Sequence, residues 1–80
     1  MPAKKYTDKD KKMISSKLRY LRQKFGMSQD EIAGHLGIVR STYTCYELGI
    51  TVPDIIMFYK LAGMFGVKME WFLQESSVES

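Results

Sequence analysis

Several features that assign a chain to a chemical class are scarce or absent in these 80 residues. The single cysteine, Cys45, excludes an internal disulfide and a zinc site built from cysteines. No apolar run approaches the roughly 20 residues that cross a membrane, and the basic N-terminus is not followed by a hydrophobic segment. The sequence therefore predicts a soluble, cytoplasmic protein.

The residue patterns of catalysis are missing as well. The sequence contains no metal-ligand spacing, no phosphate-binding loop and no pairing of a nucleophile with a base. The single histidine, His35, is expected to be solvated or bonded to backbone, and no neighbour in sequence activates the Cys45 thiol for redox sensing. We expect a protein that is not an enzyme and that holds no metal or cofactor.

The chain does have an ordinary hydrophobic content and an uneven distribution of charge. Hydrophobic residues make up 45% of it, which predicts one small folded domain rather than disorder. Residues 1–26 contain nine Lys and Arg against two Asp, a balance of +7, whereas residues 27–80 balance at −4. The basic first third favours a polyanionic partner, although a solvated lysine-rich helix has the same composition.

Capping residues and hydrophobic spacing predict a first helix. Thr7, with Asp10 three residues later, can form a capping box, and Gly26 marks the helix end. Between them an apolar stripe repeats at helical spacing: Ile14, Leu18, Leu21 and Phe25. Four basic residues lie off this stripe and are expected in solvent: Lys11, Lys12, Arg19 and Lys24. Residues 1–6 show no periodicity and are predicted to be a flexible basic arm.

The stretch from Ser28 to Gly49 predicts two short helices joined by a tight turn. Ser28 and Glu31 can form a second capping box, and Gly37 supplies the positive φ at the turn. The second of these helices spans about residues 40–48. Apolar side chains lie at helical spacing through the stretch: Ile32, Ala33, Leu36, Ile38, Tyr43 and Tyr46. This is the pattern of a helix-turn-helix.

Two more helices are expected after this motif. Pro53 and Asp54 mark the start of one, whose core stripe is Ile55, Phe58, Leu61, Ala62 and Phe65. A short fifth helix spans residues 68–74, and residues 76–80 form a polar tail. We therefore expect an all-α, compact five-helix domain over residues 7–75.

The motif resembles the lambda Cro/cI-type repressors, a large family also called XRE-like. That family has Gln at the start of the first motif helix, here Gln29, and Tyr-Glu-x-Gly at the end of the second, here residues 46–49. One position differs. Val39 stands where the family usually has a Ser or Thr N-cap, so the second helix starts without that cap or uses Ser41 instead. The resemblance covers about residues 14–74.

The resemblance implies a lambda-repressor-like domain that binds double-stranded DNA sequence-specifically, as a bacterial or phage transcriptional regulator and a repressor. In such motifs the second helix enters the major groove with its N-terminal residues toward the bases. The expected base contacts are Arg40, Ser41, Thr44 and Cys45, of which Arg40 suits a guanine edge. The expected contacts to the DNA backbone are Gln29, Thr42, Lys4, Lys5 and Arg22.

The family also implies an ion pair and a homodimer. Arg22 and Glu47 are expected to form a salt bridge between the first and third helices, which orients the recognition helix. A dimer is expected because one recognition helix reads too few base pairs to find a site in a genome. The expected interface lies on an apolar excess near the C-terminus: Ile50, Val52, Met57, Met64, Met69 and Trp71.

Three other functions are consistent with the same residues. One is an antitoxin, whose main partner is a toxin protein, and another is the controller protein of a restriction-modification system. The third is a protein-interaction module with a degenerate DNA surface, which predicts no salt-dependent DNA binding.

Overall fold

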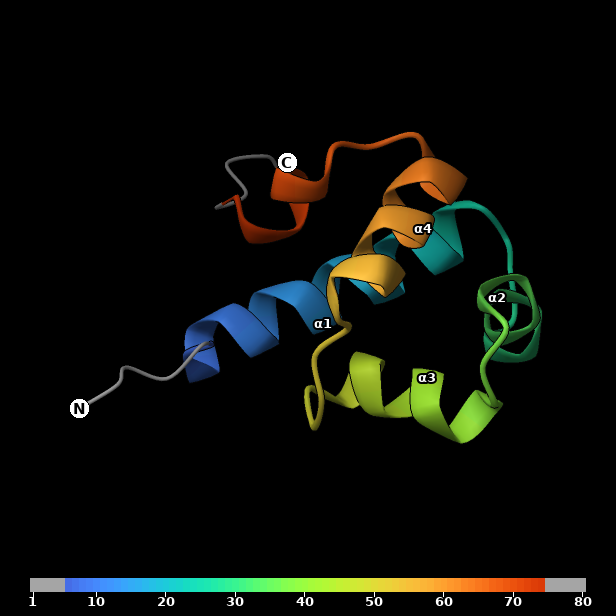
Figure 1. The fold of residues 1–80 in the computed structure, drawn as a ribbon, viewed down its shortest axis with the longest axis horizontal. Coiled ribbons are helices and arrows are strands. Elements are labelled where there is room, and N and C mark those ends of the chain that lie inside the picture. Colours follow the sequence, from blue (N-terminus) through green and yellow to red (C-terminus); the bar gives the residue numbers. More distant parts are fainter. Residues whose placement is uncertain (1–5, 75–80) are drawn as a thin grey trace.

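Four α-helices and one short 3-10 helix follow one another along the chain, without a strand, in residues 6–74, which the computed structural model describes (Figure 1). Their bounds are Asp8–Lys24 for α1, Gln29–Leu36 for α2, Arg40–Leu48 for α3, Ile55–Phe65 for α4 and Met69–Leu73 for η1. The all-α class is confirmed. The expected fifth helix is present as a 3-10 helix, since its five residues have no side-chain cap and are too few for a stable α-helix.

Side-chain caps fix where the first two helices begin. Thr7 and Asp10 form the expected capping box at α1. At α2, Ser28 Oγ accepts the amide of Glu31 at 3.1 Å, and the Glu31 carboxylate accepts the amide of Ser28 at 2.8 Å. Helix α2 ends at Gly37, whose φ of 74° lies in the left-handed region that favours glycine. The turn after it leads directly into α3.

A single core joins all five elements. Its buried apolar side chains are Ile14, Leu18, Leu21, Ile32, Ala33, Leu36, Tyr43, Tyr46, Phe58, Leu61, Ala62, Phe65 and Phe72. Helix α1 packs against α3 on one side and η1 on another, and α2 packs against α3 and α4. Helix α3 therefore lies along one edge of the molecule, supported from behind by α1 and α2 (Figure 1).

Three residues lie elsewhere than the sequence predicts. Ile55 is 71% exposed, because it is the first residue of α4 and the buried Pro53 closes the core at that end. Phe25 is half exposed, since it caps α1 beyond the last buried turn, where it packs edge-on against Phe65. Tyr6, expected in the arm, is half-buried and packs against the core.

Some expectations fall beyond the part of the chain that the structure describes. Lys4 and Lys5 of the basic arm lie outside it, as does the polar tail of residues 76–80. Within the described part, no helix is both long enough and apolar enough to span a bilayer.

Candidate nucleic-acid interface

Helix α3 has one buried side and one side open to solvent. The buried side consists of Tyr43, Tyr46 and Glu47. Arg40 and Ser41, in the first turn, are exposed. Three further residues predicted to contact DNA are partly exposed: Thr42, Thr44 and Cys45. All the predicted contact residues of α3 are therefore accessible to a partner.

The N-terminus of α3 has no side-chain cap. Val39 occupies the N-cap position in an extended conformation, with φ −80° and ψ 155°, and its side chain makes no capping hydrogen bond. Ser41 lies inside the helix and does not act as the N-cap. Of the two alternatives left open by the sequence, α3 therefore starts without a side-chain cap. The amides of the first turn keep bonding capacity at the exposed end of the helix.

The ion pair between Arg22 and Glu47 is present and connects α1 to α3. Arg22 Nε lies 2.6 Å from Glu47 Oε2, and Arg22 Nη2 donates to Glu47 Oε1 at 3.2 Å. The remaining nitrogen, Nη1, donates to the carbonyl of Met27 at 3.2 Å, just before α2. The two side chains are 18% and 3% exposed. A bidentate pair with so little solvent fixes α3 in angle as well as position.

Burial and hydrogen bonding compete at this pair. Burial raises the pKa of the Glu47 carboxyl, but hydrogen bonds from Arg22 and Gln29 and the neighbouring Tyr43 hydroxyl outweigh it, so the pKa is lowered overall. The buried Tyr43 hydroxyl has no well-formed hydrogen bond within residues 6–74. Burial first, then the Glu47 carboxylate, raises the pKa of Tyr43. Glu47 is therefore ionised and Tyr43 neutral at pH 7.

Gln29 connects the ion pair to the open side of α3. Its Nε2 donates to Glu47 Oε1 at 3.0 Å. Its Oε1 accepts the hydroxyl of Thr44 at 2.8 Å and, more weakly, Nε of Arg40 at 3.4 Å. The sequence predicts a phosphate contact for Gln29 but not this bridge, because no local pattern brings together residues 15 and 18 positions apart.

Two further arginines, Arg19 and Arg40, have different interaction partners. Arg19 is exposed, as expected, and its guanidinium also donates to the carbonyl oxygen of Glu47, in the C-terminal turn of α3. Arg40 Nη1 lies 3.9 Å from the carboxylate of Asp30, with both side chains mostly exposed. Such an exposed pair contributes little stability, so the Arg40 guanidinium can exchange Asp30 for a partner at small cost.

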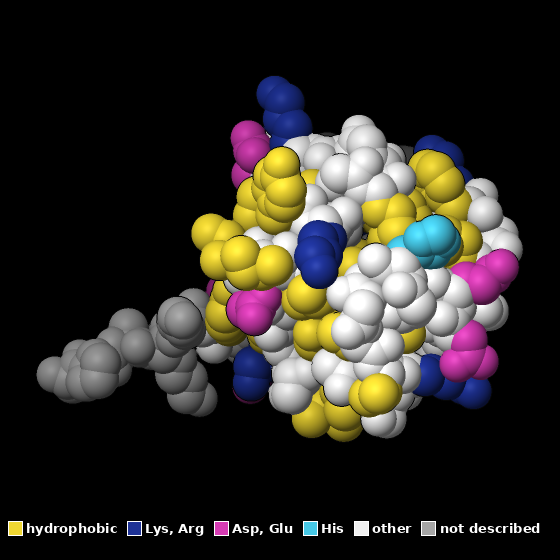
Figure 2. Space-filling model, turned by 45° about the vertical axis from the view of Figure 1, so that its right-hand side comes forward, with side chains coloured by type: hydrophobic (Ala, Val, Ile, Leu, Met, Phe, Trp, Pro, Cys, Tyr) yellow, Lys and Arg dark blue, Asp and Glu magenta, His cyan; other side chains and the backbone are white. Residues whose placement is uncertain are grey.

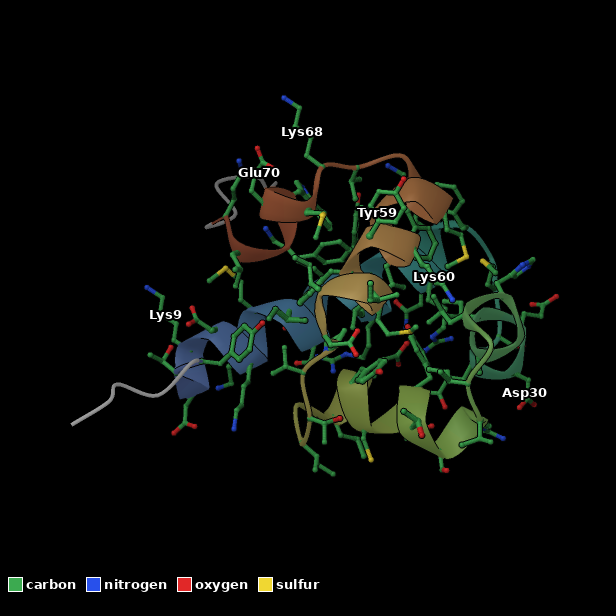
Figure 3. All side chains as sticks on the ribbon, viewed as in Figure 1. Lys9, Asp30, Tyr59, Lys60, Lys68 and Glu70 are labelled. Carbon is green, nitrogen blue, oxygen red and sulfur yellow. The ribbon has the colours of Figure 1, made fainter. Side chains whose placement is uncertain are left out.

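Most residues predicted at the dimer interface are partly buried within the chain itself. Five of the six pack against the core: Val52, Met57, Met64, Met69 and Trp71. The Trp71 ring, for example, covers the ammonium of Lys17 at 4.5 Å. Ile50 is 61% exposed. The most exposed apolar side chains of α4 are Ile55, Ile56 and Tyr59, and Tyr59 projects from that helix in Figure 3.

An open groove of about 810 Å³ lies between α2 and α4. Its lining includes His35, Tyr59, Gly63, Met64 and Met69, and Lys60 reaches across from α4 to the carbonyl of Leu36 at 3.5 Å (Figure 3). Figure 2 shows the histidine beside hydrophobic side chains on this face. His35 is exposed, and no cluster of three or more potential metal ligands occurs in the described part of the chain.

Comparison with known proteins agrees with this architecture. Residues 15–78 match the family described as helix-turn-helix domain. The chain belongs to the helix-turn-helix family. It is 36% identical over 64 residues to the cryptic phage CTXphi transcriptional repressor RstR of Vibrio cholerae, covering 80% of this chain and 58% of that protein. It is 32% identical over 66 residues to an uncharacterized HTH-type transcriptional regulator, YgzD, of Bacillus subtilis, covering 79% of this chain and 100% of that protein.

A solved structure has the same fold. The hypothetical transcription factor NHTF from Neisseria superposes with a TM-score of 0.74 at 24% identity, covering 92% of this chain and 86% of that one. These matches confirm the resemblance to the Cro/cI-type helix-turn-helix proteins. The chain spans little more than half the length of the Vibrio repressor and the full length of the shorter Bacillus regulator.

Proposed function

We propose that this helix-turn-helix protein binds double-stranded DNA sequence-specifically and acts as a transcriptional repressor. The observation that carries the proposal is the open N-terminal half of α3, where Arg40, Ser41 and Thr44 are accessible on a helix held from behind by the Arg22–Glu47 pair. A major groove accepts an α-helix, and a rigidly held helix loses little further freedom on binding. The relative in Vibrio cholerae is itself described as a transcriptional repressor. The function is binding alone, without a catalytic step, metal or cofactor.

The roles of the side chains follow from their donors and acceptors. Arg40 reads a guanine edge through its Nη groups, and Ser41, Thr44 and Cys45 contact neighbouring base edges. Three other residues contact phosphates: Thr42, Arg22 and Gln29. Gln29 Nε2 uses one hydrogen for Glu47, and its second hydrogen is the one left for a phosphate oxygen.

Lys4 and Lys5 are proposed as additional phosphate contacts. Removing residues 1–5 is the appropriate truncation, because Tyr6 packs on the core and must stay. Each lost contact lowers the slope of log affinity against log salt by about one, so the truncated protein is expected to show a slope shallower by up to about two. Titrations between roughly 50 and 200 mM salt measure this. An unchanged slope would show that the arm does not touch DNA.

A homodimer is part of the proposal, since it places two recognition helices about 34 Å apart on one face of the duplex. The support comes from three largely exposed apolar residues in the first turns of α4, Ile55, Ile56 and Tyr59, and from Ile50 in the preceding loop. Exposed apolar groups of this kind usually mark a contact surface. The methionines and Trp71 of the sequence prediction are only partly exposed and pack against the core, so they contribute less open area.

Selection of bound sequences from a random duplex pool tests the proposed function. The expected outcome is a nearly palindromic site with two half-sites one helical turn apart. Recovery of sequences with no shared motif, together with equally weak binding to all of them, would reject sequence-specific recognition.

A further inference from the structure

Thr44 lies one helical turn after Arg40 on α3, and both side chains bond the same atom, Gln29 Oε1. A threonine hydroxyl can donate one hydrogen bond and accept others, so a free threonine in a groove can approach any base edge. In this chain the hydrogen bond to Gln29 removes that freedom, and Glu47 determines the direction of that bond.

The ionised carboxylate of Glu47 has acceptors only. The group that lies 3.0 Å from its Oε1 must therefore be the amide nitrogen of Gln29, because the reverse orientation would place two acceptors in contact. This chemical requirement fixes the orientation of the Gln29 amide. The Arg22 pair keeps the carboxylate ionised, since its hydrogen bonds hold the pKa of Glu47 below the ordinary value. Gln29 Oε1 consequently points to Arg40 and Thr44 on the open side of α3.

An amide oxygen carries no hydrogen. At 2.8 Å from Gln29 Oε1, the Thr44 hydroxyl must be the donor, and its one hydrogen is committed to that bond. The lone pairs of Thr44 Oγ1 and its methyl group remain for a partner. Arg40 differs, because only its Nε bonds Gln29. Its Nη groups remain available as donors, since the exposed 3.9 Å pair with Asp30 is exchanged at small cost.

We propose that Thr44 acts toward DNA as a hydrogen-bond acceptor and selects an exocyclic amino group, adenine N6 or cytosine N4, at a position adjacent to the one Arg40 reads. The proposal rests on the proposed DNA-binding function. Those amino groups are the donors of the major groove, whereas guanine O6 and N7 and thymine O4 require a donor that Thr44 lacks. Arg40 thus presents hydrogen-bond donors and Thr44 presents an acceptor, on consecutive turns of one helix.

The test uses the site obtained by selection and compares wild type with Thr44→Val, which keeps the shape and removes the hydroxyl. The two proteins are expected to differ in preference at one position per half-site, where wild type prefers adenine or cytosine on the contacted strand. Replacing that base with the analogue that lacks the amino group, purine for adenine or 2-pyrimidinone for cytosine, is expected to weaken wild type about three- to tenfold. Thr44→Val is expected not to change with the analogue, and Thr44→Ser is expected to behave as wild type does.

A second variant, Gln29→Met, separates a DNA-contacting role of Thr44 from a purely structural one, because a structural role predicts no change in base preference. It removes the acceptor, frees the hydroxyl hydrogen and is expected to let guanine or thymine replace the amino-bearing base at that one position. Its loss of a phosphate contact weakens all duplexes alike. The effect of the analogue on wild type is measured with no variant present, so that comparison is independent of how well the variants fold.

Three results would overturn the proposal. They are a Thr44-dependent preference for guanine or thymine in wild type, equal binding of the native base and its amino-deleted analogue, and a Thr44→Val preference identical to wild type at every position. Each of these leaves sequence-specific binding intact. Failure to select any duplex is a different result, which rejects the proposed function itself.

Discussion

Glu47 is the residue on which the geometry of the open α3 face depends. Its carboxylate accepts hydrogen bonds from Arg22 and Gln29, and its backbone carbonyl accepts one from Arg19. A carboxylate that is 3% exposed is tolerated only with such partners, because burying an unpaired charge is strongly unfavourable. The same residue therefore stabilises the fold and orients the side chains proposed to read DNA.

Replacing Glu47 with Gln tests this coupling through stability. Removal of one partner from a buried pair is expected to lower the free energy of unfolding by about 3 kcal/mol at pH 7. Because the folded-state pKa of Glu47 lies below its ordinary value of 4.5, its contribution is present above that pH and is lost as the pH falls through the folded-state value. Urea unfolding at pH 7 and at successively lower pH measures both effects.

The control for that experiment is Glu70→Gln, a change at an exposed carboxylate. Wild type and the control are expected to lose stability in acid, whereas Glu47→Gln loses less because it lacks the titrating group. Equal acid sensitivity in all three proteins would show that the pair does not stabilise the folded state.

Arg40 carries the sharpest residue-level prediction about binding. Arg40→Ala is expected to cost about 1–3 kcal/mol on the preferred site and to relax the preference at one base pair per half-site. Lys68→Ala is the matched control, since Lys68 is an exposed cation that projects near η1, away from α3 (Figure 3). Weakening by Arg40→Ala that is uniform over all sequences would instead identify Arg40 as a phosphate contact.

At the scale of the helices, the capping residues could be predicted from the sequence, but the contacts between helices could not. The capping boxes at Thr7 and Ser28 depend on residues three positions apart, and both are confirmed. Periodicity identified the inward side of α4 but not where the core ends along it, so Ile55 was expected in the core and is exposed. The Gln29 bridge depends on how α2 and α3 meet, which no local pattern specifies.

The uncapped start of α3 predicts a stabilising substitution. Val39 is 65% exposed and has N-cap backbone angles, so Val39→Ser loses little packing and gains a hydroxyl for a first-turn amide. The expected gain is about 1 kcal/mol in the free energy of unfolding, measured by urea titration. Ser28→Ala, which removes an existing cap, is the reciprocal control and is expected to cost about the same. No gain from Val39→Ser would indicate that these amides are already satisfied.

For the molecule as a whole, the sequence could predict class and motif but not which apolar side chains off the core stripes stay exposed. Met57, Met64, Met69 and Trp71 are apolar and off the core stripes, yet the structure packs them against the core. Ile56 and Tyr59 have the same character in sequence and remain 58% and 72% exposed. Part of the difference depends on tertiary packing, since η1 packs against α1 and α4 and so places Met69 and Trp71 against the core.

Assembly provides the prediction at this scale. Ile56→Glu and Tyr59→Glu are expected to shift sedimentation toward the monomer and to weaken binding to two half-sites more than to one, because a buried carboxylate opposes a two-fold apolar contact. Leu73→Glu, at another partly exposed apolar residue, is the control. Trp71→Ala is less informative, since that ring also covers Lys17. If wild type stays monomeric on a full palindrome, the homodimer is rejected and this surface is a contact for another protein.

The most direct test of the central claim is the affinity for the selected duplex compared with a scrambled duplex of the same composition, at the same salt concentration. Fluorescence anisotropy with the full chain measures both. A sequence-specific regulator is expected to bind the selected duplex at least about a thousandfold more tightly. Equal affinities for the two duplexes would contradict the claim that the open face of α3 reads base sequence.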